Sequence, residues 1–393
     1  MKKIAFFINS LEGGGAERIL STIINELYTS FHITLILMED KIDYEIPKDI
    51  DIMYLGNKNI NKSNFSKLFN IFFLSYEYAR LCKNLNIDYS FSLTLRPNLI
   101  NSLSRFFYDK SKTILYEVAT PSLQYQNKSL SSWIIKILIK KIYPLAKILI
   151  SNSYGVANDL KKNFNIKNSI KVIYSPIDIG FIRNISNQKC DIFENDKRIK
   201  FITVGRLDAG KNHQMMIKSF SKLSDINTVL YILGDGILKQ ELEELVYKLN
   251  LKNRVIFLGF DNNPYKYLSK ADIFLFSSNF EGFPTVLIEA LACSLPIVST
   301  DCLNGPREIL DKNINNCLYH TKEELNLVEY GILTPVQNEL VFHDAMNLII
   351  NNTKLKLKYK QNSYDRSIYF SKEKSINSIK KIFNNELEIS CVG

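Results

Sequence analysis

The feature that most constrains this 393-residue chain is a regular alternation of short apolar runs with longer helical patterns, repeated in two successive series. Short apolar runs bounded by turn residues are typical of buried strands, and the segments between them have helical periodicity. Such alternation predicts parallel sheets with helices on both faces. We therefore expect an α/β fold with two doubly wound parallel sheets.

The two series are separated by a polar, irregular segment at residues 177–197, which we interpret as a linker. The first series has predicted strands at 2–8, 32–37, 52–55, 89–93, 113–117, 147–151 and 172–174, with helices at 16–28 and 64–85. The second has predicted strands at 199–204, 229–233, 255–258, 272–277 and 297–300, with helices at 212–223, 238–249, 264–269 and 285–293. A chain of this length divides more naturally into two domains than into one core.

Positive charge is concentrated between residues 52 and 171, where 18 lysines and arginines face 5 aspartates and glutamates. A basic region of this kind indicates an anionic partner, such as a membrane surface, a diphosphate or nucleic acid. A compositional bias without functional meaning is the alternative. Because no DNA-reading helix or RNA-stacking motif is recognisable, we do not expect a nucleic acid as the partner.

Other sequence features favour a cytoplasmic protein. No apolar stretch reaches the roughly 20 residues that span a bilayer, and the apolar run at residues 4–8 is too short for a secretory leader. The six cysteines form no C-x-x-C pair and the four histidines lack zinc spacing. We expect reduced thiols and no His-rich metal centre.

Gly14 and Gly15 belong to a run of three glycines that follows the first strand and opens the first helix. Glycine lets a ligand approach the backbone closely, and a helix N-terminus favours phosphate. The run does not complete the G-x-G-x-x-G pattern, which disfavours a dinucleotide site. We favour a diphosphate or acceptor contact over a plain tight turn.

The segment VGRLDAGKN at 204–212 repeats this strand–turn–helix pattern with two cations after Gly205. Arg206 can bind phosphate in bidentate fashion, and Lys211 adds a point charge. The spacing approaches a P-loop, but Asn212 stands where a Ser or Thr would hold Mg²⁺. The segment therefore predicts a diphosphate site rather than an ATPase. Gly234 ends the next strand at the same edge of the sheet.

Glu281 and Glu289 flank the start of the helix predicted at 285–293. The turn between them contains Gly282, Phe283, Pro284 and Thr285. N–H groups at a helix start favour an anion in the adjoining crevice. For either acid alone, an ordinary turn or a solvent-facing glutamate is the alternative. With the two cations, the acids predict one site at the carboxyl edge of the second sheet.

We expect this site to work without a metal, because Arg206 and Lys211 can neutralise a leaving diphosphate. Asp49 and Asp51 fit the D-x-D pattern of metal-dependent sugar transferases. Their position at the start of a strand explains them as solvated residues.

Five segments of the chain resemble glycosyltransferase family 4, in family order and across nearly the whole length. They are GGGAER, VGRLDAGKN, LGDG, FEGFPTVLIEAL and STDCLNGPREIL. The resemblance implies the GT-B architecture: a Rossmann-like acceptor domain at 1–183 and a nucleotide-sugar donor domain at 184–368, facing a cleft. A helix at 369–393 would cross back to the first domain.

The same resemblance implies a retaining transfer of a hexose or N-acetylhexosamine from a nucleotide sugar. The acceptor would be a lipid-linked glycan or oligosaccharide in surface-glycan biosynthesis, such as lipopolysaccharide, capsule or protein glycosylation. No cofactor is implied beyond the co-substrate, which would be UDP-GalNAc, UDP-GlcNAc or a UDP-hexose. A GT-B nucleotide-sugar epimerase and a non-catalytic sugar-nucleotide-binding subunit remain the alternatives.

The resemblance also implies roles for individual residues. Arg206 and Lys211 would stabilise the departing diphosphate, with Glu281 at the donor sugar as the third catalytic residue. Glu289 would bind the ribose hydroxyls. The implied donor-binding set is Gly14, Gly15, Gly205, Gly234, Gly282, Phe283, Pro284, Thr285 and Glu289. Relatives often have a histidine after the strand at 113–117, where this chain has Val118, so Glu117 becomes the candidate for the acceptor contact.

Residues 129–148 combine Trp133 and several isoleucines with Lys136, Lys140 and Lys141. This composition predicts a basic amphipathic helix that docks on anionic lipid, where a polyprenyl-diphosphate-linked acceptor would reside. A core helix with basic edges is an equally weighted alternative. On the first interpretation the protein would sit peripherally at the inner face of the plasma membrane.

Overall fold

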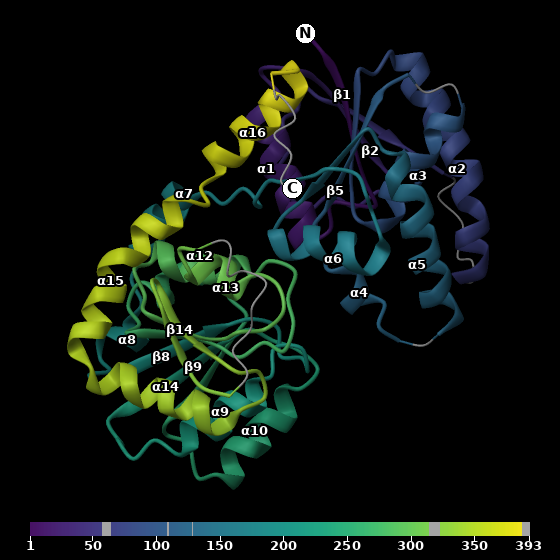
Figure 1. The fold of residues 1–393 in the computed structure, drawn as a ribbon. Coiled ribbons are helices and arrows are strands. Elements are labelled where there is room, and N and C mark those ends of the chain that lie inside the picture. The colour runs from purple at the N-terminus through teal and green to yellow at the C-terminus, as the bar shows by residue number, and fades with distance from the viewer. Residues whose placement is uncertain (57–63, 108–109, 128, 314–322, 387–393) are drawn as a thin grey trace. The chain divides into compact units, whose positions relative to one another are not determined.

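The protein folds into two α/β units in its computed structural model (Figure 1). Unit 1 comprises residues 1–176 and the C-terminal segment from Glu373, and unit 2 comprises residues 177–372. The structure describes residues 1–56, 64–107, 110–127, 129–313 and 323–386. The predicted α/β class with two doubly wound sheets is confirmed.

Unit 1 is built on a parallel sheet of seven strands in the order β3-β2-β1-β4-β5-β6-β7. The strands are β1 (Lys3–Ile8), β2 (His32–Leu37), β3 (Asp51–Tyr54), β4 (Tyr89–Leu93), β5 (Lys112–Glu117), β6 (Ile148–Ser151) and β7 (Ile170–Val172). The helices are α1 (Gly15–Leu27), α2 (Asn64–Leu85), α3 (Leu95–Ser104), α4 (Pro121–Gln124), α5 (Leu130–Ile142), α6 (Tyr154–Phe164) and α16 (Lys372–Asn384), with 3₁₀ turns η1 (Arg105–Phe107) and η2 (Tyr143–Leu145).

The central strands of unit 1 are apolar throughout because helices cover both faces of the sheet. Successive side chains of a strand point to opposite faces. Phe6 of β1 therefore packs into the core beneath α1 and α16, whereas Phe7 stacks on Tyr78 of α2 with ring centroids 4.5 Å apart. Figure 1 shows α1 and α16 on one side of this sheet and α2, α3 and α5 on the other.

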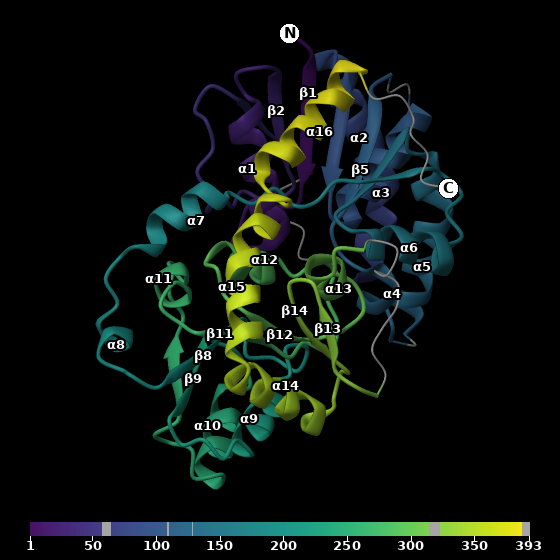
Figure 2. The ribbon, with the colours of Figure 1, turned by 60° about the vertical axis from the view of Figure 1, so that its left-hand side comes forward.

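Unit 2 has a second seven-stranded sheet in the order β10-β9-β8-β11-β12-β14-β13. Its strands are β8 (Ile199–Val204), β9 (Thr228–Leu233), β10 (Val255–Gly259), β11 (Ile273–Phe276), β12 (Ile297–Thr300), β13 (Asn326–Val328) and β14 (Gly331–Thr334). Its helices are α7 (Ile179–Ser186), α8 (Asp191–Glu194), α9 (His213–Ser221), α10 (Lys239–Lys248), α11 (Tyr265–Leu268), α12 (Thr285–Ala292), α13 (Pro306–Leu310), α14 (Glu339–Asn351) and α15 (Thr353–Ile368). One core of this unit lies beneath α9, α10 and α14 (Figure 2).

Three sequence-based expectations are wrong. Residues 177–197 are not an irregular linker, because they contain α7, which Asp178 caps by accepting a hydrogen bond from the N–H of Phe181 at 2.8 Å, and α8. The last strand of unit 1 lies at Ile170–Val172 rather than at 172–174. The sheet of unit 2 is not wholly parallel, because the edge strand β13 pairs antiparallel with β14.

The C-terminal helix α16 completes the core of unit 1. Phe383 is fully buried there, and its ring lies 5.2 to 6.3 Å from the rings of Phe6, Phe31, Tyr89 and Phe91. Aromatic pairs at such separations stabilise a core beyond the area that they bury. The helix therefore belongs to the first unit physically, although it lies at the end of the chain.

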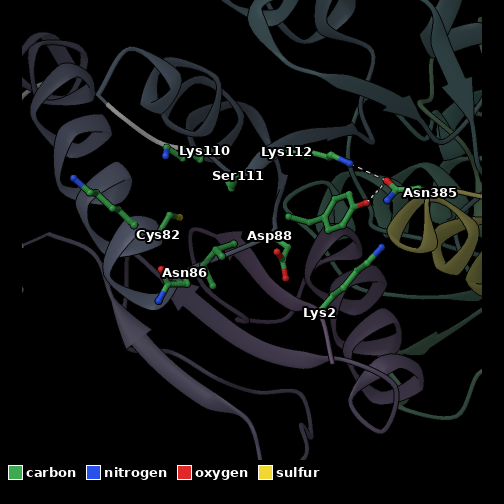
Figure 3. Close-up of a pocket in the computed structure, with 11 residues that line it drawn as sticks. Lys2, Cys82, Asn86, Asp88, Lys110, Ser111, Lys112 and Asn385 are labelled. Carbon is green, nitrogen blue, oxygen red and sulfur yellow. Dashed lines mark hydrogen bonds between the residues drawn. The ribbon is translucent and has the colours of Figure 1, made fainter.

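Polar contacts hold the end of α16 beside a hollow of about 510 Å³ at the amino ends of β1, β4 and β5. Figure 3 shows Lys112 pointing toward Asn385. Oδ1 of Asn385 accepts hydrogen bonds from Lys112 at 2.8 Å and from the hydroxyl of Tyr89 at 2.6 Å. The ammonium of Lys2 donates to the carbonyl of Phe383 at 2.6 Å. These lysines therefore anchor a helix at the edge of the sheet opposite to the strand-to-helix loops.

We expect Phe383→Ala to lower the free energy of unfolding of unit 1 by about 3–5 kcal/mol, the usual effect of emptying a buried aromatic site. The matched control is Phe72→Ala on α2, whose ring is exposed and whose loss should cost no more than about 0.5 kcal/mol. Denaturant unfolding followed by circular dichroism measures both. Equal effects of the two substitutions would contradict the packing of α16 in this core.

Candidate active site

Four loops meet at the carboxyl edge of the unit 2 sheet because β8, β9, β11 and β12 run parallel. Ligands of open α/β sheets bind at this edge. The sequence-predicted residues of this half lie on or beside these loops: Gly205, Arg206 and Lys211 after β8, Gly234 after β9, and Glu281, Gly282, Phe283, Pro284, Thr285 and Glu289 after β11.

Lys211 and Glu281 form the central contact of the site. The Nζ of Lys211 donates to Oε1 of Glu281 at 2.5 Å, although 70 residues separate them in the chain. Their side chains are only 24% and 14% exposed, so water screens this pair less than a surface pair. The structure thus brings together one predicted cation and one predicted acid from separate loops.

Asn279 joins the same two loops through its backbone and side chain. Its N–H donates to the carbonyl of Gly210 at 2.8 Å, and its Oδ1 accepts from Nδ2 of Asn212 at 3.1 Å. The hydroxyl of Ser277 adds a bond to the carbonyl of Lys211 at 2.7 Å. These polar side chains hold the Lys211 backbone in place, and sequence reasoning missed them because short polar residues in loops have many possible uses.

Asn212 has a structural reason to replace the hydroxyl residue of a P-loop. Its backbone is left-handed, with φ of 49°, a conformation that asparagine tolerates better than Ser or Thr. Its side chain caps α9 by accepting a hydrogen bond from the N–H of Met215 at 3.3 Å.

Arg206 lies on the same loop as Lys211 but extends into solvent. Its side chain is 84% exposed, and its Nε is 3.6 Å from Oδ2 of Asp208. An exposed pair of this kind contributes little to stability. The guanidinium can therefore turn to an anionic ligand at little cost in stability.

The loop after β12 supports Glu281 from the other side. The N–H of Glu281 donates to the carbonyl of Leu303 at 3.3 Å. Asp301 and Arg307 form a buried ion pair at 2.5 Å across this loop, and breaking such a pair is strongly destabilising. The sequence marked Arg307 as part of a motif but gave no signal of its partner.

The remaining predicted residues of unit 2 are packed rather than exposed. Glu289 is buried on α12, and the ring of Phe283 lies 5.8 Å from that of Phe370. Gly234 has φ of 143°, and a Cβ there would lie 2.0 Å from the carbonyl oxygen of Gly205. Close contact with the neighbouring loop therefore already requires glycine at this position.

Gly14 and Gly15 lie at the start of α1 in unit 1. A Cβ on Gly15 would meet no atom within 4 Å, and one on Gly14 would meet only the carboxylate of Glu17. Packing among the described residues therefore does not require glycine at position 15, and the space beside it is open.

Glu117 ends β5 in unit 1, and its side chain is turned into the protein. Its Oε1 accepts from the N–H groups of Val118 and Ala119 at 3.1 and 3.2 Å, and its Oε2 accepts from the hydroxyl of Tyr143 at 2.7 Å. Burial raises the pKa of Glu117 to about 7, against the opposing effect of these hydrogen bonds. In this structure the carboxylate shapes the loop that follows it.

Within the described residues, no group of three or more His, Cys, Asp or Glu side chains is placed to hold a metal ion. Asp51 opens β3, as expected for a residue at the start of a strand. Of the six cysteines, Cys317 and Cys391 lie outside the described residues, and the other four are not in disulfide bonds.

Comparison with known proteins gives consistent matches. A family model described as glycosyl transferases group 1 matches residues 184–366. A Campylobacter jejuni protein is 39% identical over 376 residues, covering 95% of this chain and 97% of its own length. It is named N-acetylgalactosamine-N,N'-diacetylbacillosaminyl-diphospho-undecaprenol 4-alpha-N-acetylgalactosaminyltransferase.

A second C. jejuni protein, a GalNAc-alpha-(1->4)-GalNAc-alpha-(1->3)-diNAcBac-PP-undecaprenol alpha-1,4-N-acetyl-D-galactosaminyltransferase, is 27% identical and covers 91% of this chain and 94% of its own. Among solved structures, Anabaena Alr3699/HepE in complex with UDP has a TM-score of 0.76 at 17% identity, over 98% of this chain and 100% of its own. A Rickettsia africae glycosyltransferase has a TM-score of 0.77 at 18% identity, over 99% of both chains. At these identities the structures show a shared fold, and the predicted GT-B class is confirmed.

The raised pKa of Glu117 predicts a pH-dependent stability of unit 1. The folded state binds the proton of Glu117 more tightly than the unfolded chain does. The protonated carboxyl therefore contributes to the free energy of unfolding below the unfolded pKa of 4.5, and this contribution is lost as the pH rises through about 7. Glu117→Gln should therefore gain stability relative to wild type between about pH 5 and about pH 8. Denaturant unfolding at the two pH values measures this difference.

The stability of Glu117→Gln must be compared with that of wild type at each pH, because His213 in unit 2 changes the stability of the protein with pH in the opposite direction. Burial lowers the pKa of His213 to about 4, so its contribution is lost as the pH falls from its unfolded value of 6.5 through 4. An equal stability difference for Glu117→Gln at both pH values would show that this carboxyl group has no raised pKa.

Proposed function

The chain belongs to the glycosyl transferases group 1 family, and from that premise we propose that it transfers N-acetylgalactosamine from UDP-GalNAc to a glycan linked to polyprenyl diphosphate. The relative with 39% identity has a name that states this sugar and a diphospho-undecaprenol acceptor. UDP-GlcNAc and UDP-hexoses are the other donors to compare. The product would enter surface-glycan biosynthesis.

The observation that carries this proposal is the Lys211–Glu281 contact at the carboxyl edge of unit 2. When the bond between the anomeric carbon and the diphosphate breaks, negative charge develops on the departing UDP. Lys211 has further N–H donors beyond the one that Glu281 accepts, and Arg206 on the same loop supplies a planar fork for phosphate. Fixed cations at the point of developing charge are an effective way to lower the barrier.

Glu281 has a second role in this scheme, because it positions the ammonium of Lys211 and places a carboxylate beside the donor sugar. Glu289 would accept hydrogen bonds from the ribose. We further propose that the anomeric configuration is retained, since a UDP-linked α-sugar would give the α-linkage that the relative's name states. The chemistry requires no metal if the two cations stabilise the leaving diphosphate.

The test is incubation of the purified chain with UDP-GalNAc and a polyprenyl-diphosphate-linked hexosamine glycan, with mass spectrometry and NMR of the product. We expect one added N-acetylhexosamine in α-linkage. Arg206→Ala and Lys211→Met should each lower kcat/KM by at least about 100-fold, the usual effect of removing one electrostatic donor. The matched control Lys218→Met removes a charge from α9 that pairs with Glu339, and it should change kcat/KM by no more than about twofold.

Full turnover in both site variants would refute the roles given to these cations. An epimerase would instead interconvert UDP-sugars without any acceptor. A non-catalytic subunit would bind UDP-GalNAc and produce neither outcome.

For its location, we propose that unit 1 contacts anionic lipid through α5 and the neighbouring aromatic residues. Trp133 is 61% exposed on α5, and Leu130 and Ile137 are also exposed. The helix contains three lysines and no acidic residue. This composition suits the headgroup region of an anionic membrane.

Further exposed aromatic side chains lie on the same face of the unit 1 sheet. Phe72, Phe73 and Tyr76 of α2 and Phe106 of η1 are each at least half exposed. The ring of Tyr76 lies 5.8 Å from that of Phe107, which links α2 to η1 on this face. Several large aromatic side chains exposed on one face favour an interaction surface. None of the described helices is long and apolar enough to cross a bilayer.

We expect the chain to float with liposomes that contain phosphatidylglycerol, and less with neutral ones. Reversing the charge of the adjacent pair Lys140/Lys141 to Glu should reduce binding at least about tenfold, because each lysine near such a surface contributes about 1 kcal/mol. The same reversal at Lys161/Lys162 on α6 is the matched control. Equal losses from both pairs would indicate a general charge effect and reject α5 as the contact.

A further inference from the structure

The loop between β4 and α3 in unit 1 contains polar groups that none of the roles above uses. β4 lies between β1 and β5 in the sheet. Thr94, which follows β4, and Arg96, in the first turn of α3, therefore lie between the glycine run after β1 and Glu117 at the end of β5. This is the ligand-binding edge of a parallel sheet.

Arg96 is an arginine without a polar partner among the described residues. Its Nε is buried and has no hydrogen-bond partner. Burial lowers the pKa of Arg96, and the charge of Glu39 opposes this effect. Arg96 is half-buried, and a buried N–H without a hydrogen bond is unfavourable by itself. This donor and the rest of the guanidinium are therefore suited to binding an anion.

Thr94 adds a strained backbone to the same loop. Its φ is 68° and its ψ is 157°, which is a genuine outlier for a β-branched residue. Its Oγ1 is buried without a hydrogen-bond partner, and its side chain does not cap α3. Strain of this kind persists mainly where function requires it.

Asn152, after β6, has a further unsatisfied atom at this edge. The residue is 3% exposed, and its Nδ2 donates to the carbonyl of Val118 at 3.0 Å, which fixes the amide. Its Oδ1 has no hydrogen-bond partner. Native proteins leave few buried polar atoms unpaired, so unpaired atoms from two strand-to-helix loops of one edge point to an absent ligand.

The side chains of Arg96, Thr94 and Asn152 indicate the chemical class of the ligand. A guanidinium suits a phosphate, whereas a threonine hydroxyl and an asparagine oxygen suit sugar hydroxyls. Beside the glycine run, the space at Gly15 is open. A sugar phosphate contains a suitable partner for each of these groups.

We propose that Arg96 binds the diphosphate of the acceptor, with Thr94 and Asn152 contacting the sugar next to it. The proposal rests on the proposed function and names residues that select the acceptor. The UDP-sugar donor also has a diphosphate, so the experiment must distinguish an effect on acceptor binding from an effect on donor binding.

The experiment compares wild type with Arg96→Gln on two acceptors: the polyprenyl-diphosphate-linked glycan and a benzyl glycoside of the same glycan without phosphate. We expect the KM for the first acceptor to rise about 10- to 100-fold, in line with the loss of a charge-assisted hydrogen bond. The KM for UDP-GalNAc and the kcat/KM for the benzyl glycoside should stay unchanged. Arg105→Gln at the opposite end of α3, where the guanidinium bonds the carbonyl of Leu145, is the matched control.

A higher KM for UDP-GalNAc would assign Arg96 to the donor diphosphate and overturn the proposal. An equal loss on both acceptors, or no loss on either, would also overturn it. A structural role predicts a lower unfolding midpoint for Arg96→Gln, whereas removal of a half-buried cation with an unpaired Nε predicts an equal or higher one.

Calorimetric titration with farnesyl diphosphate gives a readout that needs no transfer activity. Binding should weaken about 10- to 100-fold in Arg96→Gln and persist in Arg105→Gln. If wild type binds this diphosphate but transfers no sugar, the proposed function fails and the phosphate site stands. Equal binding by wild type and Arg96→Gln would refute the site itself.

Discussion

Parallel strand pairing is the constraint on which the rest of this structure depends. It places every strand-to-helix loop of a unit at one edge of its sheet, whatever the distance between these loops in the chain. Lys211 and Glu281 are 70 residues apart and still meet at 2.5 Å for this reason. The same constraint gathers the loops after β1, β4, β5 and β6 at one edge of unit 1.

The two units use cations differently at these edges. In unit 2 the ammonium of Lys211 is already paired, so the site is electrostatically balanced without a ligand and Glu281 orients the cation. In unit 1 the Nε of Arg96 has no hydrogen-bond partner among the described residues, and the charge of Glu39 opposes the effect of burial on the pKa of Arg96. A paired cation suits a group that must hold its position during chemistry, and an unpaired one suits a group whose main task is to bind.

The faces of unit 1 also differ in what covers them. The face under α1 is closed by α16, whose Phe383 fills the aromatic core. The helices on the other face bury one side against the sheet and leave Phe72 and Trp133 exposed. Exposure of apolar rings to water is unfavourable, and burial of these rings in a lipid headgroup region beside lysines would remove that cost. For this reason we connect this face with lipid. The C-terminal helix α16 thus stabilises unit 1 on one face of its sheet, whereas the helices on the other face have exposed aromatic side chains.

The sequence by itself determined the α/β class, most strand positions and the family motifs, because buried parallel strands require continuous apolar runs and phosphate-binding loops require glycine beside cations. The sequence-based prediction failed at residues 177–197, where a polar composition indicated an irregular linker. These residues form α7 and α8, and their buried faces are defined by contacts with residues distant in the chain. Only the tertiary structure decided that Asn279 holds the Lys211 loop, that Glu117 turns inward and that Nε of Arg96 has no hydrogen-bond partner in the described part of the chain. Hydrogen-bond partners and burial depend on residues far apart in the chain, and no local pattern encodes them.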